Sequence, residues 1–208
     1  MKLVDLTITD FMNVLGSDEP APGGGSASAL AAAMGISLTK MVTELTVGKK
    51  KYAEFDEIIK QCLKESSEVQ KELLQAIDED TEAFNEVSAV FSMPKETEQE
   101  KAQRRDAMQV ALKGAARTPY SMMDKIVQAL KITQKAVGKS NVNAASDLGV
   151  AALNLKSALQ GAWLNVLINL SGIKDEVFVD QYRTAGEKLL AEGCQLADAI
   201  YADILKIV

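Results

Sequence analysis

One carboxylate in this chain stands on a helical face that is otherwise apolar. Apolar residues recur at steps of three and four along residues 56–91, and Asp80 takes the place in this seam between Ile77 and Phe84. Burial raises the pKa of a carboxyl group toward neutrality, which is the condition a general acid needs at neutral pH. The alternative is an aspartate that holds a neighbouring helix by a buried hydrogen bond. Asp78 falls off the seam, so Asp80 is the first candidate for a catalytic carboxylate and Asp78 the second.

The absence of histidine and the placement of the two cysteines limit the catalytic groups that this chain can use. The chain has no histidine, which excludes Ser-His-Asp triads, Cys-His pairs and His-ligated zinc sites. Its two cysteines, Cys62 and Cys194, lie far apart in helical patterns without a Cys-x-x-Cys spacing, and we expect them to be reduced core residues. Proton transfer must therefore fall to Asp, Glu, Lys, Tyr or bound water.

A glycine-rich loop is the second feature with chemical potential. Gly23, Gly24 and Gly25 are followed by Ser26 and then by a helix of small residues. The free N–H groups and the dipole at a helix N-terminus favour an anion. The loop lacks the Lys-Ser/Thr ending of a P-loop and the Gly-x-Gly-x-x-Gly spacing of a dinucleotide fold, which argues against a nucleotide site. The alternative is a tight corner that lets two helices touch.

Two further clusters carry polar groups, and each leaves a structural alternative open. The Lys49-Lys50-Lys51-Tyr52 cluster could bind an anion or form a solvated helix end. On the apolar helix that follows residue 141, polar side chains recur at helical spacing and could bind a heterocycle or cross-link two helices or subunits. These side chains are Asn143, Asp147, Asn154, Asn165 and Asn169.

The elements that must position these residues all read as helices, because helical spacing recurs and no segment sustains an alternation of period two. We expect an all-α bundle of about seven helices with long central helices, in a single domain over residues 1–208. The expected helices run from Thr9 or Asp10 to Gly16, from the glycine loop to near Gly48, over 56–91, from Thr97 to near Arg117, from Pro119 to Gly138, over 141–173, and from Asp175 to the end. The second of them should bury Leu30, Met34, Leu38, Met41 and Leu45.

Small residues on two helices suggest a close contact between helices. Ala27, Ala29, Ala31, Ala32, Ala33 and Gly35 leave little side chain on one helix, and Ala151, Ala158 and Gly161 do the same on another. One domain can satisfy one such face internally, so two faces predict a homodimer or a larger assembly.

Charge and hydropathy limit the partners and the location. The net charge of -6 disfavours nucleic acid and anionic membranes as main partners. The most apolar stretch, residues 148–173, is interrupted by polar side chains, so it reads as a buried helix rather than a membrane span. The first ten residues lack the apolar core of a secretory signal, and the expected location is the cytoplasm.

Six motifs in unbroken order resemble one known family. They are residues 20–26, 48–52, 77–84, 93–95, 143–148 and 165–170, which read PAPGGGS, GKKKY, IDEDTEAF, MPK, NAASDL and NVLINL. They resemble the cyclodeaminase/cyclohydrolase family of tetrahydrofolate enzymes, which includes the C-terminal domain of formiminotransferase-cyclodeaminase and free-standing methenyltetrahydrofolate cyclohydrolases. The resemblance covers essentially the whole chain.

The resemblance implies an all-α homodimer or larger assembly that needs no metal and no cofactor, with a tetrahydrofolate derivative as substrate. The acidic motif would supply Asp80 as the catalytic residue. The anionic glutamate tail of folate, single or polyglutamylated, would give the 49–52 turn and the glycine loop something to bind, and the pterin edge would match Asn143 and Asp147. A separate formiminotransferase is an implied partner. The alternative is a non-catalytic helical dimer that binds folate or a protein.

Overall fold

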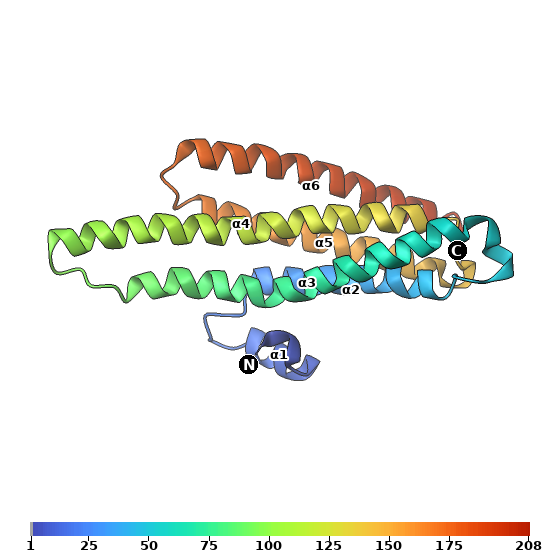
Figure 1. The fold of residues 1–208 in the computed structure, drawn as a ribbon, viewed down its shortest axis with the longest axis horizontal. Coiled ribbons are helices and arrows are strands. Elements are labelled where there is room, and N and C mark those ends of the chain that lie inside the picture. The colour runs from blue at the N-terminus through green and yellow to red at the C-terminus, as the bar shows by residue number, and fades with distance from the viewer. Residues whose placement is uncertain (1) are drawn as a thin grey trace.

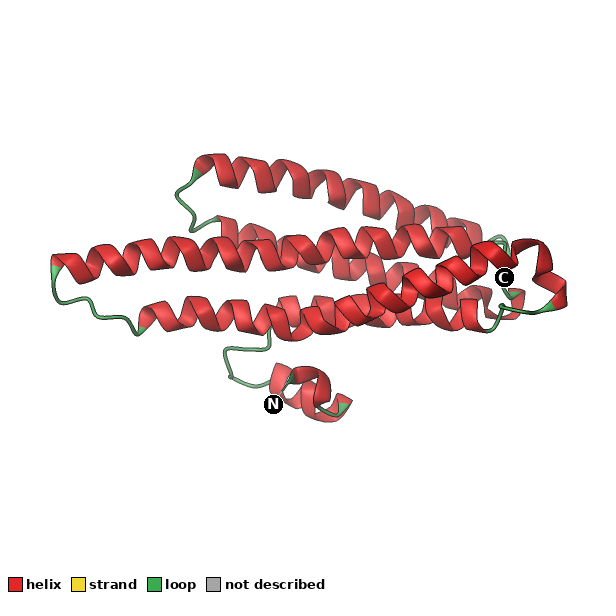
Figure 2. Cartoon of the chain, viewed as in Figure 1, coloured by secondary structure: helices red, strands yellow, loops and turns green. Residues whose placement is uncertain are grey.

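The structure is a computed structural model that describes residues 2–208. Within that range the chain forms six α-helices and three short 3₁₀ helices and contains no strand (Figures 1 and 2). In chain order the elements are η1 (Leu3–Asp5), α1 (Ile8–Leu15), α2 (Gly24–Glu44), η2 (Lys50–Phe55), α3 (Asp56–Phe91), α4 (Glu98–Ala136), η3 (Val142–Ala144), α5 (Ala145–Leu170) and α6 (Glu176–Ile204). The predicted all-α bundle is confirmed.

Four long helices form the body of the bundle. α2 packs on α3, α3 on α4, α4 on α5 and α5 back on α2, while α6 covers the side formed by α4 and α5 (Figure 1). The tip of the α3–α4 hairpin extends beyond the beginning of α2 (Figure 1). No helix among residues 2–208 has the length and apolar character that crossing a membrane requires.

Capping groups set several helix ends as the sequence predicts. Thr97 and Glu100 form the expected capping box at the start of α4, and Asp175 accepts a hydrogen bond from the Phe178 N–H at the start of α6. The first helix begins earlier than expected, because Thr7 is the residue that caps it.

We expected Pro119 to begin a separate helix, but it lies inside the continuous helix α4. Proline has no N–H to donate to the carbonyl four residues earlier, which here is that of Ala115. The side-chain amide of Asn169 on α5 donates to this carbonyl instead, at 3.0 Å. A contact from a distant part of the chain therefore satisfies the group that Pro119 leaves free.

The inward face of α2 is not the one expected. Met34, Met41 and Leu45 are exposed, and Leu30 and Leu38 are half-buried, whereas Ala29 and Ala32 are fully buried. Small side chains occupy the inner face of α2 because α5 approaches α2 closely. A Cβ at Gly35 would lie 2.7 Å from Leu155 Cγ and 3.0 Å from the Ala151 carbonyl oxygen, both on α5.

This close pairing also removes our argument for a second subunit. The two faces of small residues, on α2 and on α5, satisfy each other inside one chain, and Ala151 and Ala158 are buried there. A homodimer must therefore be argued from other surfaces.

The apolar seam of α3 is buried as predicted up to Ile77 and then leaves the core. Beyond Asp80, Phe84 is 40% and Phe91 63% exposed, because the hairpin tip extends past α2. Asp80 thus stands where the core ends and an open cleft begins.

The α2–α5 contact predicts a specific sensitivity to side-chain size. Ala158→Leu should lower the free energy of unfolding by about 1–3 kcal/mol, because overpacking forces the two helices apart. Urea denaturation monitored by circular dichroism measures this change. The exposed neighbour Gln160→Leu is the control and should stay within about 0.5 kcal/mol of the unsubstituted protein. Equal stabilities for the two variants would contradict the close contact.

Candidate functional site

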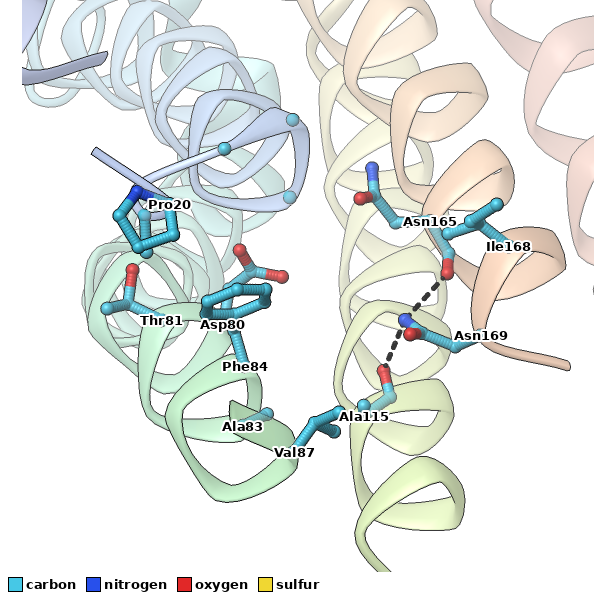
Figure 3. A pocket seen from close by; sticks show the side chains of 14 residues that line it. Pro20, Asp80, Thr81, Ala83, Phe84, Val87, Ala115, Asn165, Ile168 and Asn169 are labelled. Carbon is cyan, nitrogen blue, oxygen red and sulfur yellow. Dashed lines mark hydrogen bonds between the residues drawn. The ribbon is translucent and has the colours of Figure 1, made fainter. Parts of the chain in front are cut away.

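A cleft of about 270 Å³ opens where the seam of α3 leaves the core (Figure 3). The loop before α2 and the first turn of α2 form one side, α3 forms the base, and α4 and α5 form the opposite side. The lining residues are Pro20, Ala21, Gly23, Gly24, Gly25, Asp80, Thr81, Ala83, Phe84, Val87, Ala115, Asn165, Ile168 and Asn169. The structure brings Asp80 and the glycine loop together at this cleft.

The carboxyl group of Asp80 lies at the N-terminal end of α2 and points across the cleft toward Asn165 (Figure 3). Burial raises the pKa of Asp80 above its ordinary value, and hydrogen bonds from the hydroxyl and the backbone N–H of Ser26 offset part of that rise. The proton on this carboxyl group is therefore held more tightly than on an exposed aspartate. A group of this kind can act as an acid as well as a base.

Ser26 can serve both protonation states of Asp80. Its hydroxyl oxygen lies 3.0 Å from Asp80 Oδ2, 3.0 Å from the Ile77 carbonyl oxygen and 3.2 Å from Thr81 Oγ1. A hydroxyl has one proton to donate. It can donate to the ionised carboxylate, or it can turn to the Ile77 carbonyl and accept from the protonated carboxyl group. We expected Ser26 to bind the substrate, but its side chain is fully buried and instead positions Asp80.

The three glycines have different roles in this arrangement. A Cβ at Gly25 would collide with the Asp80 carboxyl group, so only glycine lets the carboxyl group come this close to the helix. Gly24 faces Asn165 across the cleft, and a Cβ there would only touch that amide, at 3.4 Å. A Cβ at Gly23 would meet nothing within 4 Å. The Ser26 N–H donates to Asp80, which leaves the N–H groups of Gly24 and Gly25 at the start of α2 without a carbonyl within the helix to bond.

Two asparagines on α5, Asn165 and Asn169, form the wall opposite Asp80, and their pattern in the sequence is compatible with a ligand site or with a cross-link between helices. Asn165 donates to the Gly161 carbonyl at 2.8 Å, and Asn169 donates to the carbonyls of Ala115 and Asn165 (Figure 3). Their side-chain oxygens remain as acceptors on the cleft side. Because Pro119 leaves the Ala115 carbonyl free, it indirectly fixes the side chain of Asn169. The sequence shows two asparagines four residues apart. It does not show that Asn169 lies beside the Ala115 carbonyl that Pro119 leaves without a backbone partner.

Asp78, the second candidate carboxylate, does not line the cleft. Its Oδ1 accepts a hydrogen bond of 2.6 Å from the Leu3 N–H and so ties the N-terminal segment to α3. The structure gives it an anchoring contact.

The remaining predicted binding residues lie at the other end of the bundle. Lys51 and Tyr52 line a second cavity of about 310 Å³. Val142 of η3 and the C-terminal residues Ile204 and Ile207 also line it. The Tyr52 hydroxyl accepts a hydrogen bond from the Val142 N–H at 3.0 Å. Asn143 follows Val142 in η3, and Asp147 lies in the first turn of α5, which begins directly after η3. The 21 residues of α2 separate this end from the glycine loop, which is about 30 Å at 1.5 Å per residue.

This separation corrects the expectation that one chain brings both groups together. Lys49, Lys50, Lys51, Tyr52, Asn143 and Asp147 cannot share a small-molecule site with Asp80 within a single chain. The length of the helix between the glycine loop and Gly48 was the signal in the sequence that could have revealed this distance.

Among residues 2–208, no cluster of three or more His, Cys, Asp or Glu side chains could hold a metal ion. The cleft instead offers one carboxyl group of raised pKa, two amide oxygens, the N–H groups of a helix start and the apolar side chains of Phe84, Val87 and Ile168. Such a cleft can bind a flat, nitrogen-rich ring and move a proton on one face of it.

Comparison with known proteins gives consistent relatives. The family model described as formiminotransferase-cyclodeaminase matches residues 7–188. A methenyltetrahydrofolate cyclohydrolase from Methylorubrum extorquens is 38% identical over 198 residues, which cover 95% of each chain. The formimidoyltransferase-cyclodeaminase of Rattus norvegicus is 32% identical over 190 residues, which cover 91% of this chain but only 35% of the rat protein. The chain thus spans about a third of that longer relative.

A solved structure shows the same architecture. The crystal structure of formiminotetrahydrofolate cyclodeaminase from Thermotoga maritima superposes with a TM-score of 0.81 and 28% sequence identity, covering 99% of this chain and 97% of that one.

The contact between Gly25 and Asp80 predicts a coupled effect on stability. Gly25→Ala should lower the free energy of unfolding by about 1–3 kcal/mol, because the new methyl group collides with the carboxyl group. In an Asp80→Ala background the same change should cost much less, since the collision partner is gone. Chemical denaturation of the four proteins in this double-mutant cycle measures the coupling. Gly23→Ala is the matched control and should stay near the unsubstituted stability; a coupling of zero would contradict the contact.

Proposed function

This chain belongs to the formiminotransferase-cyclodeaminase family, and on that premise we propose that it is an enzyme of folate one-carbon chemistry. Its substrate is a tetrahydrofolate derivative with one carbon on N5 or bridging N5 and N10. The reaction is hydrolysis of 5,10-methenyltetrahydrofolate to 10-formyltetrahydrofolate, formation of the methenyl compound from 5-formiminotetrahydrofolate, or both.

The observation that carries this proposal is the Asp80 carboxyl group in the cleft. Its pKa is raised, its partner Ser26 can satisfy it with or without its proton, and it faces open space lined by apolar and amide groups. Both reactions pass through a tetrahedral centre and need one group that takes a proton at one stage and returns it at another. The bridged substrate is a cation, so the ionised carboxylate also stabilises it electrostatically.

In the cyclohydrolase reaction, water adds to the methenyl carbon while the Asp80 carboxylate takes one of its protons. The carboxyl group then gives this proton to N5 as the bond between the carbon and N5 breaks. Loss of the second proton of the water leaves the formyl group on N10. The N–H groups at the start of α2 lie beside the carboxyl group and can stabilise negative charge on the added oxygen. The cyclohydrolase relative, which matches over nearly its full length, favours this reaction.

In the cyclodeaminase reaction, N10 attacks the carbon of the protonated formimino group (CH=NH2⁺), and the proton of N10 passes to Asp80. The carboxyl group returns this proton to the resulting amino group, which leaves as ammonia while the methenyl cation forms. The structural neighbour named as a cyclodeaminase, which aligns over almost the entire chain, favours this second candidate. Its substrate needs a formiminotransferase to supply it, and that enzyme is the implied partner.

The assembly and location that fit this function are a homodimer or larger oligomer in the cytoplasm. The support for a second subunit is an apolar surface on α2 and α5, where Met34, Met41 and Leu164 are exposed.

The proposal is tested by the absorbance of the methenyl chromophore. Purified protein should cause that absorbance to decay from 5,10-methenyltetrahydrofolate or to appear from 5-formiminotetrahydrofolate. Which substrate is turned over decides between the two reactions. If neither substrate changes faster than its uncatalysed rate, the alternative of a non-catalytic folate-binding or protein-binding dimer replaces the enzyme.

Asp80→Asn should leave the helical content unchanged but lower kcat by about 100-fold or more, because the amide cannot relay a proton. The matched control is Asp78→Asn, the same chemical change two residues away, which keeps an acceptor for the Leu3 N–H and should retain most of the activity. Steady-state kinetics and circular dichroism of both variants give the answer. Near-normal turnover in folded Asp80→Asn would remove Asp80 from the mechanism.

A further inference from the structure

One hydroxyl group in the Asp80 cleft takes no part in the proposed reactions. Thr81 follows Asp80 on α3, is half-buried and lines the same cleft (Figure 3). Its Oγ1 lies 3.2 Å from Ser26 Oγ, and within residues 2–208 this is the one hydrogen bond of the Thr81 side chain. The Thr81 hydroxyl is therefore bound to the residue that holds the Asp80 carboxyl group.

This orientation differs from that of other threonines in the bundle. Thr118 and Thr133 of α4 each donate to the carbonyl four residues earlier, which is the usual local hydrogen bond of a helical threonine. For Thr81 that carbonyl belongs to Ile77, and the Ser26 hydroxyl lies 3.0 Å from it. The Thr81 hydroxyl thus contacts α2 instead of bonding back along its own helix.

The number of protons available makes Thr81 the donor in this contact. The Ser26 hydroxyl has one proton and two lone pairs. When Asp80 is ionised, the Ser26 proton goes to the carboxylate, 3.0 Å away. The contact with Thr81 is then a hydrogen bond only if Thr81 donates.

The same orientation of Thr81 also suits the protonated form of Asp80. The carboxyl group then donates to Ser26, and the Ser26 proton goes to the Ile77 carbonyl. A second lone pair on Ser26 Oγ still accepts from Thr81. The Thr81 hydroxyl therefore stays in place while Asp80 gains and loses its proton.

Donation from Thr81 favours the ionised form of Asp80. A hydroxyl group that accepts a hydrogen bond becomes a stronger donor, because hydrogen bonds in a chain polarise one another. Ser26 therefore holds the carboxylate more strongly while it accepts from Thr81. Burial acts in the opposite direction and raises the pKa of Asp80, so the two hydroxyl groups together limit that rise.

The charged groups near the cleft leave this balance to the hydroxyl groups. Among the described residues that line the cleft, Asp80 is the one titratable group, and α5 carries no charged residue over 157–170. The neighbouring charged side chains are exposed or half-buried and do not line the cleft. They are Asp18 and Glu19 before α2, Asp78, Glu79, Glu82 and Glu86 on α3, and Lys113 and Arg117 on α4.

We propose that Thr81 is a positioning residue for Asp80, whose hydroxyl donates to Ser26 and so holds the Ser26 hydroxyl in the orientation that the carboxylate requires. This inference rests on the proposed function, in which Asp80 must be ionised to take a proton from the attacking water. Thr81 acts on the reaction only through Ser26 and Asp80.

Thr81→Val tests the proposal with a side chain of similar shape that lacks the hydroxyl group. In a carbon-13 NMR titration, the pKa of Asp80 should be higher in this variant than in the unsubstituted protein, because support for the ionised form is lost. Thr81→Ser keeps the hydroxyl group and should keep the unsubstituted pKa. Thr118→Val, which removes a hydroxyl group that bonds within α4, is the matched control and should leave the pKa of Asp80 unchanged.

Two results of this titration would overturn the proposal. One is an unchanged pKa of Asp80 in folded Thr81→Val. The other is a change in Thr81→Ser with none in Thr81→Val, since the methyl group of Thr81 would then matter and its hydroxyl group would not.

The pH dependence of kcat/KM gives a second readout. Activity rises with pH through the pKa of Asp80, since the reaction begins from the carboxylate, and a higher pKa moves this acid limb to higher pH. On the limb, Thr81→Val should lower kcat/KM by about fivefold, the scale of one hydrogen bond. At higher pH its profile should approach that of the unsubstituted protein. A loss of equal size at every pH would indicate a structural role and contradict the proposal.

A Ser26→Ala background tests whether Thr81 acts through Ser26. In this background, Thr81→Val should change the pKa of Asp80 no further, because the intermediate hydroxyl group is already gone. Equal shifts in the two backgrounds would overturn the proposal, and circular dichroism checks that each variant is folded. The NMR titration needs no substrate, so protein that converts neither folate would refute the proposed function while the titration would still decide the role of Thr81.

Discussion

The arrangement depends on one contact, between the Asp80 carboxyl group and the first turn of α2. The helix start and the Ser26 hydroxyl favour the ionised form, while burial favours the neutral form and prevails. A raised pKa means that the folded chain binds this proton more tightly than the unfolded chain does. Folding is therefore penalised as the pH rises from the ordinary range of an aspartate through the raised pKa of Asp80. This loss of folding stability arises at the cleft, where the Asp80 carboxyl group can meet a ligand.

Small residues make this contact possible at two levels. Gly25 lets the carboxyl group approach the helix, and the alanines of α2 let α5 approach closely enough to place Asn165 and Asn169 on the opposite wall. The same packing displaces the large residues of α2 to the outside. The apolar surface is thus a consequence of the packing that builds the cleft, which is why the site and the proposed interface belong to one structural argument.

Much of this could be predicted from the sequence, since it follows from local rules. The α3 boundaries, the capping box at Thr97 and the position of Asp80 all come from periodicity and helix-end chemistry. Three features could not be predicted locally. The continuity of α4 through Pro119 depends on Asn169, which is fifty residues away in sequence. The inward face of α2 depends on the shape of α5, and the role of Ser26 depends on its neighbours in α3.

The central claim is that Asp80 holds its proton more tightly than an ordinary aspartate while facing the cleft. Carbon-13 NMR of protein labelled at aspartate carboxyl groups tests it directly, with the Asp80 resonance assigned by its absence in Asp80→Asn. Followed across pH, this resonance should titrate above the ordinary pKa of an aspartate, which is about 3.9. In Ser26→Ala the pKa of Asp80 should rise further, because a hydrogen bond to the ionised form is lost. Titration at or below the ordinary range in the unsubstituted protein would contradict the account.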